Sequence, residues 1–373
     1  MMTDETDLKL WIALSLSNEK FELFPNLADI TPELVKKLIL REGVAPLLSY
    51  HIRGTKAGNL VPEYLLAFLE NIERKAIARE LYRKGLNRRF FEKLNTAGID
   101  FLVLKGEAVA HQLYPQSYLR TRCDADVLFR DRESAISAWK ILEKEGYKKA
   151  NTLDGEFVGY QFNCYKNIGS AFSNEIDIHH KINDYIWLAD RLPFDELYAK
   201  NVNFKIDDIE LRTTGLVHSL LHACIHRVNN KVLGKENRLI WVYDIHLLCN
   251  EISSEQWHKL AEKAKKKNLA FIVYEALTTS KDLFYTRIPE TVLLILKEAA
   301  NKECSPFGRT GKRWKLYYFD FVENKGILNK AKQIREHLIP NPDYIKQKYP
   351  GAGSWNLPYY YLKRLLSGLG KYF

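Results

Sequence analysis

Residues 101–129 read FLVLKGEAVAHQLYPQSYLRTRCDADVLF, and this stretch decides the fold. The apolar run 101–105 predicts a short strand. Gly106 follows it, and residues 107–114, which stop before a proline, predict a helix. Residues 124–129 predict a second strand. Strand, glycine, helix and strand in this order indicate a unit of mixed helix and strand.

Asp124 and Asp126 lie at the start of this second strand, two residues apart. Side chains at i and i+2 of a strand point to the same face, so the two carboxylates project together. Adjacent carboxylates repel unless a cation lies between them, and hard cations such as Mg²⁺ prefer oxygen ligands. Such a pair is also common at strand ends and turns, where it binds no metal.

A further alternating strand, 175–182, carries one more acid, Asp177. His179 shares its face, whereas the adjacent His180 faces the other side. A glycine lets the backbone approach a phosphate, and a helix N-terminus favours an anion. Together with the acid pair, this layout is the one needed to hold two metal ions and a triphosphate. The alternative is that Asp177 only caps or pairs locally.

Several ordered blocks of the chain carry a resemblance to a known family. The first block, LVLKGEAV…R…DADVLF, resembles the signature LLKGxAL…Y…R…DxDLLV of uncharacterised bacterial nucleotidyltransferases. EIDIHHKI and LLHACIHRV…RLIWVYDIHLL are similar to later blocks of that family. These proteins are distant relatives of the DNA polymerase β-like nucleotidyltransferases, and the first block also resembles the AbiEii-type toxins. The resemblance runs over roughly residues 75–365.

The resemblance implies an α+β fold, in which a small polymerase β-like nucleotidyltransferase core with a mixed or antiparallel sheet is flanked by N- and C-terminal helical regions. It carries Asp124, Asp126 and Asp177 over as catalytic metal ligands. The implied cofactor is a pair of Mg²⁺ ions, with Mn²⁺ possible.

For nucleotide binding, the resemblance carries Gly106 over as the phosphate-loop glycine and matches Lys105 and Arg120 to basic positions beside the site. His179 is a further nucleotide-binding candidate. Glu107 departs from the superfamily, where Ser or Gly follows the loop glycine, so a loop hydroxyl is missing. Lys105 and Arg120 are expected to compensate by binding the triphosphate.

The alternative to triphosphate binding is that the basic residues of this stretch are ordinary solvated cations without a ligand. It applies to Lys105 at a strand end and to Arg120 and Arg122 in a loop.

The implied reaction transfers a nucleoside monophosphate from an NTP to an acceptor hydroxyl of a small molecule or peptide, with release of pyrophosphate. One alternative is a toxin-like enzyme that acts on RNA or protein. Another is a catalytically silent nucleotide- or RNA-binding protein. Three converging acids argue against the silent protein, because a binding module does not need them.

Pattern and composition divide the chain into four regions. They are a helical region 1–95, the nucleotidyltransferase core 96–205, a helical region 206–300 and a basic, aromatic-rich tail 301–373. The tail holds 14 Lys and Arg against 5 Asp and Glu, hence +9 of the net +10. A tail of this kind can bind RNA by phosphate neutralisation and stacking. The alternative is a helical subdomain with a solvated basic face and an aromatic core.

The rest of the composition is that of an ordinary globular protein. No run approaches the roughly 18 apolar residues that cross a bilayer. The acidic N-terminus does not resemble a signal peptide, and the five cysteines are scattered without CxxC spacing. We therefore expect a cytoplasmic location with free thiols.

Two histidines in the second helical region need separate weighing. His222 and His226 lie four residues apart, on one helix face, but no Glu stands between them, which excludes an HExxH zinc site. Asp244 on a later helix is expected to orient one of them or to pair with Arg238. We expect a buried structural network, with nucleotide-base or acceptor contacts as the alternative.

Overall fold

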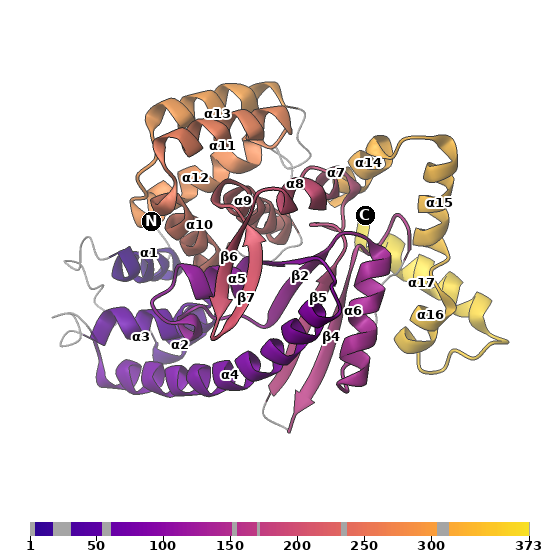
Figure 1. Ribbon diagram of the computed structural model, residues 1–373, viewed down its shortest axis with the longest axis horizontal. Coiled ribbons are helices and arrows are strands. Elements are labelled where there is room, and N and C mark those ends of the chain that lie inside the picture. The colour runs from indigo at the N-terminus through magenta and orange to yellow at the C-terminus, as the bar shows by residue number, and fades with distance from the viewer. Residues whose placement is uncertain are drawn as a thin grey trace. The chain divides into compact units, whose positions relative to one another are not determined.

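The computed structural model describes residues 4–17, 31–53, 61–150, 155–169, 172–232, 237–303 and 313–372 (Figure 1). They form a mixed α/β fold that divides into two compact units, interleaved along the chain. Unit 1 comprises Met1–Arg89, Leu104–Cys123 and Val202–Ser305, and unit 2 comprises Phe90–Val103, Asp124–Asn201 and Pro306–Phe373. The long helix α4, Glu63–Thr96, contributes residues to both.

Unit 2 is built on a five-stranded mixed sheet with the order β1-β2-β5-β4-β3. Its strands are β1 (Phe101–Leu104), β2 (Asp124–Phe129), β3 (Lys148–Lys149), β4 (Gln161–Ile168) and β5 (Phe172–His179). β2 runs parallel to β5, whereas β4 is antiparallel to both β5 and β3. All of β1 and all of β2 except Asp124 is buried, as is usual for strands covered on both faces.

The helices of unit 2 come from two parts of the sequence. They are α6 (Arg132–Lys144), α7 (Ile186–Ala189), α8 (Phe194–Tyr198), α14 (Arg313–Glu323), α15 (Ile327–Leu338), α16 (Pro342–Lys348) and α17 (Leu357–Tyr372). α6 begins where Asp131 accepts a hydrogen bond from the Ser134 amide, and it packs on β2 and β5. α14 packs on α7, where Asp320 accepts a hydrogen bond of 3.0 Å from the Trp187 amide.

Unit 1 is largely helical. Apart from its share of α4, its helices are α1 (Asp4–Ser17), α2 (Pro32–Glu42), α3 (Ala45–Arg53), α5 (Lys105–Gln112), the 3-10 turn η3 (Ser117–Leu119), α9 (Leu216–Val232), α10 (Leu239–Glu251), α11 (Ser254–Lys266), α12 (Ala270–Phe284) and α13 (Glu290–Lys302). A two-stranded sheet pairs β6 (Asn201–Ile206) with β7 (Ile209–Thr214).

One hydrophobic core joins the early and late helices of unit 1. It contains Leu8 of α1 and Leu48 of α3 together with Tyr243 of α10 and Phe284 of α12. Helices from the first hundred residues thus bury their apolar faces against helices from beyond residue 200. The four-region division of the chain, with boundaries at 95, 205 and 300, stays a prediction.

The strand predictions are confirmed to different degrees. The strand at 124–129 matches β2 at both ends, and the strand at 101–105 is one residue too long because Lys105 begins α5. The strand predicted over 175–182 is β5, which starts and ends three residues earlier. The sequence pattern also predicts a strand over 156–165, and this is wrong for Glu156 to Tyr160, since β4 begins at Gln161.

The late start of β4 has a physical cause. The amides of Glu156 and Phe157 donate hydrogen bonds of 3.0 and 2.8 Å to the carboxylate of Glu336, so they are not available to a strand ladder. Within the described ranges, each helix is too short or too polar to cross a lipid bilayer.

Candidate metal centre

The centre of the unit 2 sheet brings acidic side chains onto one face. Asp126 of β2 lies directly opposite Asp177 of β5, and Asp177 lies directly opposite Asn163 of β4. Directly opposite residues point to the same face, so the three side chains form a row across the sheet. Ala125 and Val127 point the other way and are fully buried.

Three side chains of this face present donor atoms within 4.8 Å of one another: Asp126, Asp177 and His179. Asp126 and His179 are buried and Asp177 is half-buried. His179 Nε2 lies 2.9 Å from Asp126 Oδ1. Asn163 Nδ2 donates to Asp177 Oδ1 at 2.7 Å and to Glu175 Oε2 at 3.3 Å. These contacts fix the orientation of the Asp126 and Asp177 carboxylates.

The donor set fits a divalent metal ion. Carboxylate oxygens suit Mg²⁺ and Mn²⁺, and an imidazole nitrogen adds a ligand that borderline ions accept. Within the described part of the chain, the buried Nδ1 atom of His179 has no hydrogen-bond partner. An unsatisfied buried nitrogen beside two carboxylates is costly unless a ligand meets it. The site therefore has a physical reason to bind a ligand.

Asp124 lies two residues before Asp126 and directly opposite Glu175, on the same face. Its carboxylate is not in the group of converging donors. The structure thus brings together two of the three predicted acids, and metal binding by Asp124 stays a prediction. Nucleotide binding by His179 also stays a prediction, because its described contact is with Asp126.

Two polar residues of this face were missed in the sequence. Glu175 was visible as part of the alternation Glu175-Asp177-His179 along one strand. Asn163 carried no local signal, since only the antiparallel register of β4 and β5 places it opposite Asp177.

In unit 1, Arg120 lies in a buried network. Its Nε and Nη2 atoms donate to Asp244 Oδ2 at 3.0 and 2.7 Å, and Tyr114 donates to Asp244 Oδ1 at 2.8 Å. The predicted pairing of Asp244 with Arg238 is wrong, because Arg238 Nε donates to the Arg41 carbonyl instead. Asp244 therefore pairs with Arg120 and not with Arg238, and the Arg120 guanidinium contacts it through two nitrogen atoms.

Gly106 packs closely against the same arginine. A Cβ atom at this position would lie 3.3 Å from Arg120 Cζ, so the glycine has a packing role whether or not it binds phosphate. The preceding Lys105 has a φ of 48°, a left-handed conformation that is unusual for a residue with a side chain. Such strain is often found at functional sites.

The departure at Glu107 also has a structural explanation. Glu107 is buried and accepts hydrogen bonds from Arg122 Nε at 2.6 Å and Asn87 Nδ2 at 3.2 Å. Arg122 Nη2 donates to Glu80 at 2.7 Å. The alternative in which Arg122 is a solvated loop cation, which we favoured for this residue, is wrong, because its side chain is 3% exposed.

The pKa of Glu107 confirms its structural character. Burial acts to raise the pKa, but the charges of Arg122, His111 and Arg83 outweigh it, so the pKa is lowered from its ordinary value. Glu107 is therefore an ionised, compensated carboxylate.

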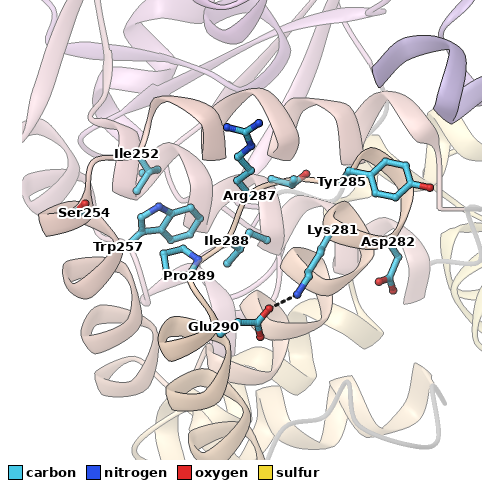
Figure 2. A pocket seen from close by; sticks show the side chains of 11 residues that line it. Ile252, Ser254, Trp257, Lys281, Asp282, Tyr285, Arg287, Ile288, Pro289 and Glu290 are labelled. Atoms are coloured by element: carbon cyan, nitrogen blue, oxygen red, sulfur yellow. Dashed lines mark hydrogen bonds and ion pairs between the residues drawn. The ribbon is translucent and has the colours of Figure 1, made fainter. Parts of the chain in front are cut away.

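A separate pocket of about 850 Å³ lies in the helical part of unit 1, around the turn between α12 and α13 (Figure 2). Trp257, Ile288 and Pro289 form its apolar side, and Lys281 and Glu290 pair with each other across it. Among the described residues, the one group of side chains able to hold a metal ion is the group on the unit 2 sheet. This pocket therefore lies apart in sequence from the metal-binding side chains. We place the candidate centre at Asp126, Asp177 and His179 because their donor atoms converge.

The match to a family model supports a transferase. The profile of a family described as uncharacterised nucleotidyltransferase matches residues 28–285. No curated protein matches the chain. A solved structure, an antigenic nucleotidyltransferase-like protein from Paracoccidioides brasiliensis, is similar at 14% identity and a TM-score of 0.34, over 54% of this chain and 96% of that one.

Proposed function

Because the chain belongs to the uncharacterised nucleotidyltransferase family, we propose that it transfers a nucleoside monophosphate from an NTP to an acceptor hydroxyl and releases pyrophosphate. The observation that carries the proposal is the convergence of Asp126, Asp177 and His179 on one face of a buried sheet. We take the unit 2 sheet as the polymerase β-like core, and the relation to AbiEii-type toxins as part of the same proposal.

Asp126 and Asp177 would hold the divalent cation, Mg²⁺ or Mn²⁺, with Asp124 as a further ligand of a two-ion site. A bound cation neutralises charge on the reacting phosphate and lowers the pKa of an attacking oxygen. The contact of 2.9 Å between His179 Nε2 and Asp126 Oδ1 would hold that carboxylate in position.

Asp177 is the proposed acceptor of the proton from the attacking hydroxyl. Its Oδ1 atom is held by Asn163, so the carboxylate is oriented while Oδ2 can accept another hydrogen bond. A carboxylate fixed in this way is suited to general base catalysis.

Lys105, Gly106 and Arg120 are the proposed nucleotide contacts. The Nε, Nη1 and Nη2 atoms of Arg120 all donate to acceptors within the chain, and our first choice of the two cations is Lys105. The strained backbone of Lys105 supports the same choice.

The acceptor class separates the two catalytic versions of the proposal. A small molecule or peptide is our first choice. An RNA acceptor is favoured by the tail, where Trp355 is 88% exposed and able to stack on a base. Activity on RNA should fall steeply with salt concentration, because it depends on phosphate neutralisation.

The experiment that tests the proposal supplies each α-labelled NTP with Mg²⁺ to fractions of small-molecule and RNA extracts. Wild type is compared with the double variant Asp126→Asn/Asp177→Asn. The matched control, Glu133→Gln/Glu143→Gln, removes two exposed carboxylates from α6 of the same unit.

The proposal expects labelling by wild type and by the control, and none by the Asp126/Asp177 variant. Labelling that survives in the Asp126/Asp177 variant would reject the metal centre. NTP binding without labelling of any fraction would instead favour the catalytically silent protein.

A further inference from the structure

A second pocket, of about 310 Å³, lies wholly within unit 1, between α2, α3, α4 and the residues around η3. Its volume is at the lower end of the range for small-molecule sites. The charges of its lining are unequal: one acid, Glu80, faces five cations. These cations are Lys75, Arg79, Arg83, Arg120 and Arg122.

Two of the five cations are neutralised inside the protein. Arg120 is bound to Asp244, and Arg122 is bound to Glu107 and Glu80. These two arginines shape the wall of the pocket, and their charges are already paired with carboxylates of unit 1.

The other three cations, Lys75, Arg79 and Arg83, are spaced four residues apart on α4 and so lie on one face of that helix. Within the described ranges, Lys75 and Arg79 form no ion pair with a carboxylate. The nearest carboxylate to Arg83 is Glu80, at 3.7 Å, and Glu80 already binds Arg122. The pocket therefore has an excess of positive charge.

Arg83 distinguishes this pocket from a solvated basic helix face. A solvated face would leave its cations in water, but Arg83 is 7% exposed. Its Nη2 atom donates to the Arg122 carbonyl at 2.7 Å, while its Nε atom has no hydrogen-bond partner among the described residues. A buried guanidinium with an unmet donor is costly unless an anion completes it.

The pKa of Arg83 points the same way. Burial, followed by the neighbouring charge of Arg122, lowers the pKa below its ordinary value, despite the opposing effect of Glu107 and Glu80. The carboxylates around it thus do not fully compensate this cation.

We propose that this pocket binds a phosphorylated small molecule of about mononucleotide size, with its phosphate between Lys75, Arg79 and Arg83. Guanidinium groups bind phosphate by two parallel hydrogen bonds. Apolar side chains of the lining, Ile39, Pro46 and Ile72, give the organic part of the ligand a dry surface, and the Tyr118 ring offers a stacking face. The site uses none of the acids of unit 2, so it is additional to the proposed metal centre.

Binding is measured by titration calorimetry on the full chain in EDTA, with inorganic pyrophosphate, AMP and a short single-stranded RNA as separate probes. EDTA removes divalent cations, so the acidic face of unit 2 does not contribute. The test variants are Lys75→Gln/Arg79→Gln, whose residues are exposed, and Arg83→Lys, which keeps the charge but loses the bidentate geometry. The control Arg74→Gln/Arg89→Gln removes two exposed cations of the same helix from outside the lining.

The inference expects wild type and the Arg74/Arg89 control to bind AMP equally, and each test variant to bind it about tenfold or more weakly. The Asp126→Asn/Asp177→Asn variant should bind AMP as wild type does, which separates this site from the proposed function. Failure of wild type to bind AMP would overturn the inference, as would equal weakening in the control. Binding of RNA alone, with steep salt dependence, would assign the basic helix face to nucleic acid and overturn it too.

Discussion

The two units both bury carboxylates, but they compensate them differently. In unit 1, Glu107 is bound by Arg122 and Asp244 by Arg120, each through a charged hydrogen bond of 2.6 to 2.7 Å. In unit 2, Asp177 is bound by the neutral amide of Asn163, and within the described ranges it forms no ion pair with Lys or Arg. The charge of the partner, a guanidinium in unit 1 and a neutral amide at Asp177, therefore distinguishes the structural carboxylates from this candidate metal ligand.

The largest expected effect on stability comes from breaking compensation in unit 1. Arg122→Met leaves Glu107 and Glu80 buried without their main cation, and should lower the free energy of unfolding by about 3–5 kcal/mol. Urea denaturation measures this change. The exposed variant Arg89→Gln is the control and should change stability by less than about 0.5 kcal/mol. A loss below about 1 kcal/mol for Arg122→Met would show that the network contributes little.

Removing a carboxylate from the unit 2 sheet should preserve stability but reduce activity. Asp126→Asn and Asp177→Asn each relieve repulsion between two acids, so we expect thermal stability to stay equal or rise. Nucleotide transfer should fall on the order of 10²–10³-fold or more. If both variants unfold at a temperature where wild type is still folded, the two acids stabilise the fold. That result would contradict the comparison.

A third carboxylate, Asp320, sharpens the comparison, because it is buried and bound by backbone amides, and within the described ranges it forms no ion pair with Lys or Arg. Burial raises the pKa of Asp320 to about 7, against the smaller effect of hydrogen bonds from Trp187 and Ile186. The folded state thus holds a proton between about pH 4 and 7 that the unfolded state has released, so stability falls as pH rises through this window. Asp320→Asn should be about 4 kcal/mol more stable than wild type at pH 8 and nearly equal at pH 4.

The difference in stability between Asp320→Asn and wild type is measured by thermal unfolding at pH 4 and at pH 8. Equal differences at both pH values would show that Asp320 is ionised throughout. The control is Asp343→Asn, an exposed acid of α16 in the same unit.

The smallest expected effect is that of Gly106→Ala. The added methyl meets the Arg120 guanidinium, which Asp244 holds in place, and must displace it by a few tenths of an ångström. We expect a loss of about 1 kcal/mol in stability, measured by urea denaturation. The double variant Gly106→Ala/Arg120→Ala should show no additional cost from the methyl, and a cost that persists would place its cause elsewhere.

Local patterns predicted the strands better than the contacts of the site. DADVLF fixed β2 at both ends because its alternation is local. The meeting of Asp126 and Asp177 was expected from a family resemblance, whereas Asn163 depends on the register of β4 against β5 and was missed. Arg122 was misjudged because its partner Glu80 lies 42 residues away in sequence. The periodicity of a sequence does not predict which residues pair when they are this far apart in the chain.

The same distance effect explains the error at β4. The carboxylate that takes its early amides belongs to Glu336, 180 residues after Glu156. Asp244 was expected to orient His222 or His226 or to pair with Arg238, whereas its described side-chain partners are Arg120 and Tyr114. The partner itself, Arg120, was not foreseen.

The central claim is that the acids of unit 2 form a metal centre whereas those of unit 1 do not. The most direct test is the affinity for Mn²⁺, measured by titration calorimetry and by electron paramagnetic resonance on the full chain. The account predicts that Asp126→Asn and Asp177→Asn lose Mn²⁺ binding, while the Glu133→Gln/Glu143→Gln control binds as wild type does. Equal Mn²⁺ affinity in all four proteins would contradict it.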